Sequence, residues 1–222
     1  MNDTTATAPT YADRDQALKE FVTAQVSAVQ NRYLRDSPDA VAALARLRRG
    51  VGHPAGSQPD LYALTLDNLP EILTDPAYFT GRERAGLPTP WEQAAHDAIT
   101  LHAWHQQSKA QRMHRPGIGF GAAMRQLGEH TNPEGVRRRF HALGTAAHHH
   151  GRLIMLRSLV GQLRAETIPL DYGRLASDLR RLHRADSARR VLLQWGRDYH
   201  RTPTTTSGSG QDGTSPAEGD IK

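Results

Sequence analysis

Apolar side chains recur every three to four residues along most of this 222-residue chain. The stretch from Asp13 to Arg35 shows the pattern most clearly, with apolar residues at positions 18, 21, 22, 26, 29 and 33. This spacing places the apolar side chains on one face of an α-helix, whereas a half-buried strand would need strict alternation. Because no segment alternates convincingly, the sequence predicts an all-α protein.

Capping residues and prolines mark where the helices begin and end. Three segments combine a capping side chain with a proline at the first helical position: Ser37–Pro38, Thr89–Pro90 and Asn132–Pro133. Glu92 adds the acid of a capping box to the second of them. We expect Asp171 and Asp186 to cap the last two helices and Gly50 to end the helix that follows Pro38.

These signals predict about eight helices in a compact bundle over residues 11–201. A break near residues 110–120, rich in glycine, could divide the bundle into two sub-bundles. Between Gly50 and Pro90, prolines and glycines leave room only for short helices around 61–66 and 69–73. Residues 1–10 are expected to form a flexible N-terminus, and residues 202–222, rich in Thr, Ser, Gly and Pro, a disordered tail.

The composition excludes several classes of site. The chain has no cysteine, which rules out disulfides, thiolate zinc sites, iron–sulfur clusters and a cysteine nucleophile. Met1 to Thr10 lack a basic start followed by an apolar run, and no later stretch approaches the roughly 18 apolar residues of a membrane span. We therefore expect a cytoplasmic protein without membrane contact.

Positive charge is concentrated in the second half of the chain. Residues 1–109 carry a formal charge of −3, residues 110–201 carry +10, and residues 202–222 carry −2. Arginine supplies 25 of the 28 cations. Because the guanidinium group presents a planar fork of donors that suits phosphate, this distribution favours a polyanionic partner such as nucleic acid.

The basic residues form clusters at expected helix ends and in loops. The candidate nucleic-acid-binding residues in these clusters are Arg48, Arg49, Lys109, Arg112, Arg115, Arg137, Arg138 and Arg139. The cap at Asn132 predicts that the triplet at 137–139 lies in a first helical turn, where cations oppose the helix dipole unless an anion compensates. The arginines between 174 and 190 alternate with Asp178 and Asp186, a pattern typical of a solvated face with local ion pairs.

No motif indicates catalysis, a metal or a cofactor. His102 and His105 lie three apart on one expected helix, and His148, His149 and His150 are adjacent. No Asp or Glu completes either set at ligand spacing, so we interpret them as solvated or locally hydrogen-bonded imidazoles. A histidine-based metallohydrolase and a stand-alone helical DNA-binding regulator remain as alternatives, although no helix-turn-helix with a basic second helix is evident.

Five linked segments resemble the CasB family, the small subunits of the type I-E CRISPR surveillance complex Cascade. Their order and spacing extend over roughly residues 15–201. They are His105–Ser108, Met113–Gly121, Arg138–Leu143, Ile168–Ala176 and Gln194–Tyr199.

This resemblance implies an all-helical, non-catalytic subunit of an antiviral complex, present in two copies beside the other Cascade subunits. It also implies a basic surface for the nucleic acids of the R-loop, chiefly the displaced DNA strand, with guide RNA and single- and double-stranded DNA as partners. Carried over by position, the family's arginines fall on Arg48 and Arg49, on Arg138 and Arg139, and on Arg157. The chain departs from the family pattern at residues 148–150 and in its tail.

Overall fold

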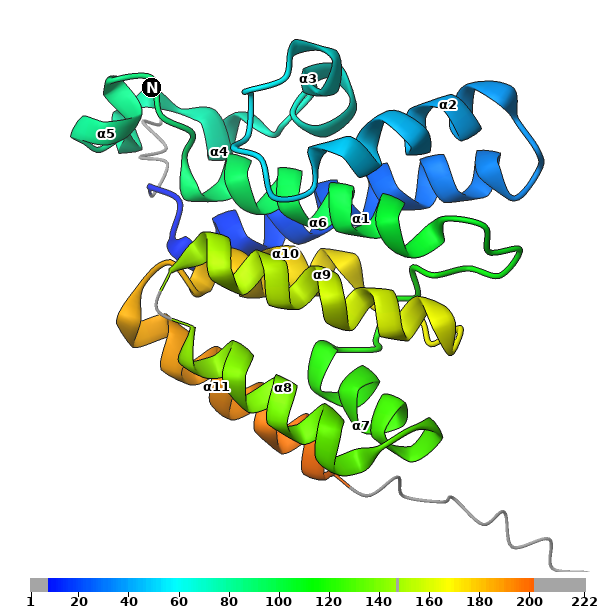
Figure 1. The fold of residues 1–222 in the computed structure, drawn as a ribbon. Helices are drawn as coiled ribbons and strands as arrows, with labels where there is room; N and C mark the ends of the chain where they lie inside the picture. The colour runs from blue at the N-terminus through cyan, green and yellow to red at the C-terminus, as the bar shows by residue number, and fades with distance from the viewer. Residues whose placement is uncertain (1–7, 147, 202–222) are drawn as a thin grey trace, which may run out of the picture.

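The computed structural model describes residues 8–146 and 148–201, and within these ranges the fold is helical throughout (Figure 1). The α-helices are α1 (Tyr11–Tyr33), α2 (Pro38–Leu47), α3 (Pro59–Thr65), α4 (Glu71–Thr74), α5 (Gly81–Arg84), α6 (Pro90–Gln106), α7 (Phe120–His130), α8 (Pro133–Thr145), α9 (His149–Ala165), α10 (Tyr172–Arg181) and α11 (Ala185–His200). Two single 3₁₀ turns accompany them, η1 (Arg48–Gly50) and η2 (Pro76–Tyr78). The all-α prediction is confirmed for the described residues, whose one extended pairing is an isolated bridge between His114 and Leu170.

Eleven α-helices occur in the described part of the chain, so the expectation of about eight is wrong. In the connector between α2 and α6, α3 and α4 correspond to the short helices expected around 61–66 and 69–73, whereas α5, with four residues, was not expected. A helix of one turn contains no repeated three-and-four stripe, and the periodicity of apolar residues therefore cannot reveal it.

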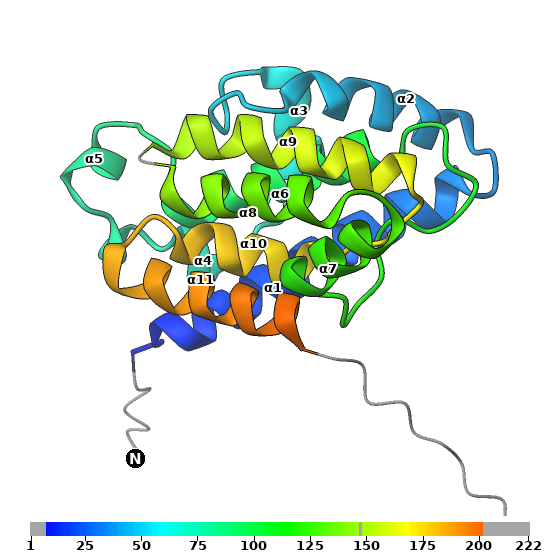
Figure 2. The same cartoon turned by 60° about the horizontal axis from the view of Figure 1, so that its bottom comes forward.

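The helices form two layers that share a core (Figure 1). In that view α1, α2, α6 and α10 make up the upper layer and α7, α8 and α11 the lower one, with α9 crossing the front between them. The buried apolar side chains form one continuous cluster from Leu18 in α1 to Trp195 in α11. In Figure 2, α11 and the start of α1 lie at the lower edge of the molecule, α10 lies above α11, and α2 and α3 lie at the upper edge.

Two glycines let helices cross closely. A side chain at Gly121 in α7 would collide with the backbone carbonyl of Trp195 in α11. A side chain at Gly173 in α10 would meet the carbonyl of Lys19 in α1, 2.6 Å away. Glycine is needed at both positions because the opposing atoms belong to the backbone and cannot rotate away.

Most predicted caps are confirmed. The Thr89 hydroxyl accepts from the amide of Glu92 at 3.1 Å, and the Glu92 carboxylate accepts from the Thr89 amide at 2.7 Å. Asn132 and Asp171 also cap their helices through side-chain oxygens.

Two cap assignments need qualification. Ser37 precedes α2, but its side chain makes no capping bond. The prediction that Asp186 caps the last helix is wrong, because α11 begins at Ala185 and Arg184 holds the cap position. Asp186 lies in the first turn, where a carboxylate is favoured by the helix dipole just as it is at a cap, so the sequence signal is the same.

The predicted disordered tail, residues 202–222, lies outside the described residues, as do residues 1–7. Within the described ranges no helix combines the length and the apolar character that crossing a bilayer requires.

Candidate nucleic-acid interface

Helix α9 carries two arginines that are held on one tryptophan. Its inner face buries Leu156 and Leu163. On its outer side, the guanidinium carbons of Arg157 and Arg164 each lie 4.6 Å from the ring centre of Trp104, which belongs to α6. Cation–π contacts of this kind restrict both side chains without neutralising their charge.

Two further cations approach α9 from neighbouring segments. The Lys109 ammonium donates to the Thr167 hydroxyl at 2.9 Å, just beyond the end of α9. Arg139 of α8 donates to the Gln162 side-chain carbonyl at 3.2 Å. We call Lys109, Arg139, Arg157 and Arg164 the α9 basic surface.

The α9 basic surface contains a hollow suited to an anion. The hollow has a volume of about 340 Å³ and is lined by Gln107, Ser108, Lys109, Gly161, Arg164 and Ala165. Across the described ranges, no carboxylate lies within ion-pair distance of any of the surface's four cations. Fixed donors without carboxylate partners can bind phosphate oxygens, which supply affinity and register but carry no base sequence.

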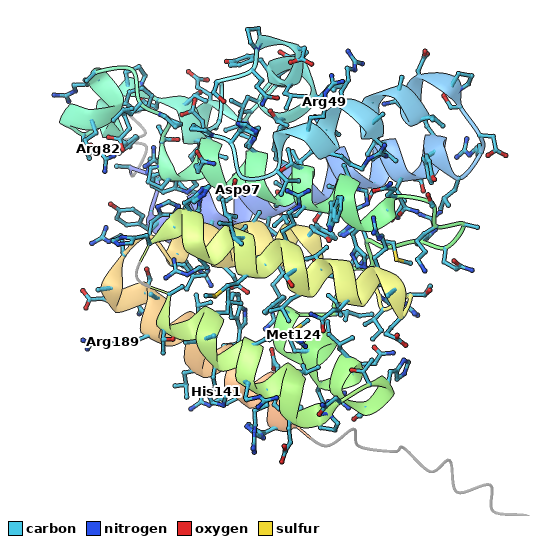
Figure 3. The ribbon with its side chains drawn as sticks, viewed as in Figure 1. Arg49, Arg82, Asp97, Met124, His141 and Arg189 are labelled. Carbon is cyan, nitrogen blue, oxygen red and sulfur yellow. The ribbon has the colours of Figure 1, made fainter. Side chains whose placement is uncertain are left out.

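The predicted residues Arg48, Arg49, Arg112 and Arg115 lie on other elements. Arg48 and Arg49 form η1, and Arg49, with two thirds of its side chain exposed, pairs with Asp60 of α3 at 3.3 Å. Figure 3 shows Arg49 at the upper edge of the molecule. Arg112 donates to the side chain of Asn31 in α1 at 2.5 Å, whereas Arg115 is exposed.

Arg137 and Arg138 are exposed on α8, beside Arg139. The assignment of this triplet to a first helical turn is wrong, because α8 begins at Pro133 and the triplet starts in the second turn. Glu134 is the charged residue of the first turn. The dipole penalty inferred from sequence therefore acts weakly here, since the dipole effect fades beyond the first turn. Of the nine predicted residues, Lys109, Arg139 and Arg157 come together on the α9 basic surface.

Sequence reasoning missed Arg164. It follows Arg157 by seven residues, which is two helical turns, so both lie on the same face of α9. The seven-residue spacing could have identified Arg164 from the sequence. The contact with Trp104 could not, because Trp104 comes from a different helix.

The arginines of α10 do not form a solvated face with local ion pairs. Arg180 and Arg181 both donate to the carboxylate of Asp15 in α1, and Arg180 is only 5% exposed. Arg174 pairs with Asp198 of α11 at 2.7 Å. These ion pairs join distant helices, so the spacing of charges along the sequence could not reveal them.

His102 and His105 are fully buried and hydrogen-bonded to distant elements, which corrects their interpretation as solvated or locally bonded. A ring nitrogen of His105 lies 2.9 Å from the Tyr172 hydroxyl, and one of His102 lies 3.4 Å from the side-chain oxygen of Gln30. Burial lowers the pKa of His105 to about 3 and that of His102 well below its ordinary value. Both imidazoles are therefore neutral at physiological pH.

The adjacent histidines have separate environments. His149 binds the buried Asp97 carboxylate at 2.8 Å, between α6 and the start of α9 (Figure 3), while His148 and His150 are exposed. Among the residues that the structure describes, no three His, Asp or Glu side chains gather in a way that could hold a metal ion.

Comparison with known proteins places the chain in a family. The model of the CRISPR-associated protein Cse2 family matches residues 43–200. The crystal structure of CasB from Thermobifida fusca superposes with a TM-score of 0.71 at 37% sequence identity, over 83% of this chain and 98% of that one. The chain belongs to the Cse2/CasB family. The family resemblance inferred from the five sequence segments is thereby confirmed.

A chain in the solved structure of a CRISPR RNA-guided surveillance complex also matches this Cse2 protein. The TM-score is 0.58 at 24% identity, over 82% of this chain and 93% of that one, which shows a shared fold. A search of curated protein sequences gave no match.

Proposed function

We propose that this Cse2 protein is the non-catalytic small subunit of a Cascade-type surveillance complex in the cytoplasm and stabilises the R-loop by phosphate contacts. Its partners are then the other Cascade subunits, a second copy of itself, and the guide RNA or the displaced DNA strand. No cofactor takes part in this role.

The observation that supports the proposal is the α9 basic surface. Two arginines held on Trp104, with Lys109 and Arg139 beside them, present fixed positive charge that no carboxylate of the described residues pairs with. In R-loop formation the RNA–DNA hybrid is about as stable as the duplex it replaces. Modest contacts to the backbone of a separated strand can therefore decide whether the open state persists.

The test is R-loop lifetime in the reconstituted complex. One variant replaces Lys109, Arg139, Arg157 and Arg164 with Ala, and another replaces Arg48, Arg49, Arg138 and Arg139, which the family resemblance selects. We expect normal guide RNA loading in both, because base pairing reads the sequence, but a shorter R-loop lifetime that worsens with salt. If both variants hold the R-loop as long as wild type at physiological salt, the proposal fails.

The same preparations separate the proposal from the two other functions considered. Isolated wild-type protein should bind unrelated sequences equally, with a log–log salt slope of roughly −4 to −5 for four to six phosphate contacts on duplex DNA. A footprint on one sequence would indicate a regulator instead. Reproducible cleavage of DNA or RNA after addition of zinc, magnesium or manganese would indicate an enzyme.

A further inference from the structure

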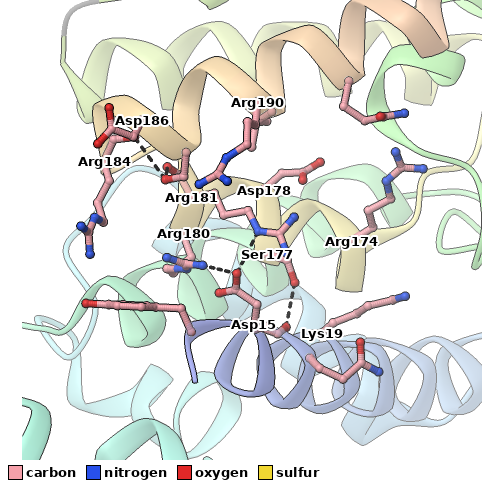
Figure 4. Close-up of a pocket in the computed structure, with 16 residues that line it drawn as sticks. Asp15, Lys19, Arg174, Ser177, Asp178, Arg180, Arg181, Arg184, Asp186 and Arg190 are labelled. Atoms are coloured by element: carbon pink, nitrogen blue, oxygen red, sulfur yellow. Dashed lines mark hydrogen bonds and ion pairs between the residues drawn. The ribbon is translucent and has the colours of Figure 1, made fainter. Parts of the chain in front are cut away.

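A second basic feature lies on α1, α10 and α11 (Figure 4). There these helices enclose a groove of about 800 Å³. Six cationic residues line it: Lys19, Arg174, Arg180, Arg181, Arg184 and Arg190. Three carboxylates, those of Asp15, Asp178 and Asp186, line it as well. None of these residues belongs to the α9 basic surface.

The six cations of the groove divide into two sets. Arg180 and Arg181 bind Asp15, and Arg174 binds Asp198, so three guanidinium groups are engaged with carboxylates. The other three, Lys19, Arg184 and Arg190, have no carboxylate within ion-pair distance among the described residues. They leave positive charge available for an anion in the groove.

The other carboxylates of the groove are placed by the protein itself. Asp178 is buried and accepts a hydrogen bond from the Trp195 indole at 2.7 Å. Asp186 lies in the first turn of α11, where the helix dipole favours it.

An aromatic pocket of about 210 Å³ adjoins the groove and shares Tyr11, Arg180 and Arg184 with it. The rings of Tyr11 and Trp91 are stacked there, with centres 5.8 Å apart and planes 13° from parallel. A cavity of about 150 Å³ is enough to hold a benzene ring, so this pocket can admit one flat ring system. Glu83, the carboxylate among its lining residues, is engaged with Thr80 in the capping box of α5.

Two buried donors that belong to lining residues of the pocket have no hydrogen-bond partner within the part of the chain that the structure describes. They are the indole nitrogen of Trp91 and the Nε of Arg180, in side chains that are 7% and 5% exposed. Both atoms are closed off from solvent, so a ring in the pocket would be recognised by the half-exposed ring of Tyr11 and by the cations of the adjoining groove. A flat ring that is linked to phosphates has the chemistry of a nucleotide.

We propose that the pocket and groove together bind one nucleotide of a single strand, with its base against Tyr11 and its flanking phosphates on Lys19, Arg184 and Arg190. This inference rests on the proposed function, nucleic-acid binding, and adds a contact that involves none of the α9 basic surface. The site selects unpaired strands, because a base inside a duplex is stacked and paired and cannot enter a pocket. An acidic polypeptide fits less well, since a carboxylate side chain would leave the aromatic pocket empty.

The experiment measures binding of three probes of equal length: single-stranded oligothymidine, the same backbone without bases, and duplex DNA. Tyr11→Ala is compared with Tyr62→Ala, a matched control because Tyr11 is 54% and Tyr62 53% exposed. Arg190→Ala is compared with Arg189→Ala, its exposed neighbour, which does not line the groove and points outward in Figure 3. Tyr11→Phe keeps the ring and reports on stacking alone.

We expect Tyr11→Ala to weaken oligothymidine binding by about fivefold or more, the lower range for one stacked base, and to leave duplex and base-free binding unchanged. Tyr11→Phe and Tyr62→Ala should bind as wild type. Arg190→Ala should make the single-strand salt slope shallower by about 0.7, and Arg189→Ala should change it less.

Different failures have different signatures. Equal wild-type affinity for the base-bearing and base-free strands, with no effect of Tyr11→Ala, would overturn the pocket and leave the α9 basic surface standing. A poly-glutamate peptide that loses affinity on Tyr11→Ala or Arg190→Ala, while nucleic-acid binding stays unchanged, would assign the groove to a protein partner and also overturn the proposal. Wild-type protein that binds none of the three probes would contradict the proposed function itself.

Discussion

The arginines of α10 and those of α9 are the same residue type in two different states. Arg180 is buried and shares the Asp15 carboxylate with Arg181, whereas Arg157 is exposed and stacks on Trp104. A buried arginine must keep its carboxylate partner, since an unpaired buried charge is strongly destabilising. An exposed arginine on an aromatic ring is ordered but still able to bind an anion. Burial and partner therefore distinguish arginines that are engaged within the fold from arginines whose charge is available to an anion, and the amount of positive charge does not.

The sharpest test of this comparison removes the carboxylate that joins α1 to α10. Asp15→Ala should lower the free energy of unfolding by about 3–5 kcal/mol, because Arg180 stays buried without a partner. Chemical denaturation of the variant and the wild type measures this loss. The matched control is Asp60→Ala, which breaks only the exposed pair with Arg49 and should cost less than about 1 kcal/mol. Equal losses in the two variants would remove the distinction between the two kinds of arginine.

The second prediction concerns pH and the buried histidines next to the α1–α10 layer. His105 has its pKa lowered to about 3 by burial, against about 6.5 in the unfolded chain, so the unfolded state binds more protons in this interval. Its stabilising contribution is complete above pH 6.5 and is lost as the pH falls towards 3. From pH 7 to pH 5 the loss is about 2 kcal/mol.

His105→Phe should remove that part of the acid sensitivity, and the exposed His150→Phe should not. The measurement is the free energy of unfolding of each variant at both pH values. Asp178, whose pKa is raised to about 6 by burial, acts in the opposite direction and loses stability as the pH rises from about 4 to 6. Because Asp178 is present in all three proteins, its effect cancels in the difference. If the free energy of unfolding of His105→Phe fell between pH 7 and pH 5 as much as that of the wild type, the lowered pKa of His105 would be contradicted.

The smallest effect on stability is expected on α9. Replacing Lys109, Arg139, Arg157 and Arg164 with Ala should cost less than about 2 kcal/mol, since exposed cation–π contacts are weak. The same change should make the salt slope on duplex DNA shallower by about 3 to 4, because each phosphate contact contributes roughly 0.9.

The control replaces four exposed arginines outside this surface, Arg32, Arg35, Arg46 and Arg197, with Ala. If it changes the slope as much as the α9 variant does, general charge and not the α9 basic surface governs binding.

Local sequence rules predicted the long helices and most of their boundaries. The capping box of Thr89 and Glu92 and the cap at Asp171 each join residues three positions apart. A single turn of the sequence therefore contains all the residues needed to predict them. The same rules failed for α5, which is too short to repeat a pattern, and for Asp186, because an aspartate is favoured both at a cap and in a first turn.

The candidate site was predictable only in part. Clustering in the sequence selected Lys109 and Arg139, and the family resemblance added Arg157. Both gave equal weight to Arg49, which pairs with Asp60, and both omitted Arg164. The groove was missed because its cations come from α1, α10 and α11, and the sequence between 174 and 190 suggests local pairing.

The sequence by itself determined the helical class, the family and the excess of arginine in the second half, because periodicity, linked motifs and charge are properties of the chain. Only the tertiary structure decided which arginines are free to bind. Arg180 acquires Asp15 as its partner from 165 positions away, and Arg157 acquires Trp104 from another helix. A charge becomes structural or available through the groups that packing places around it, and packing joins residues that no local pattern connects.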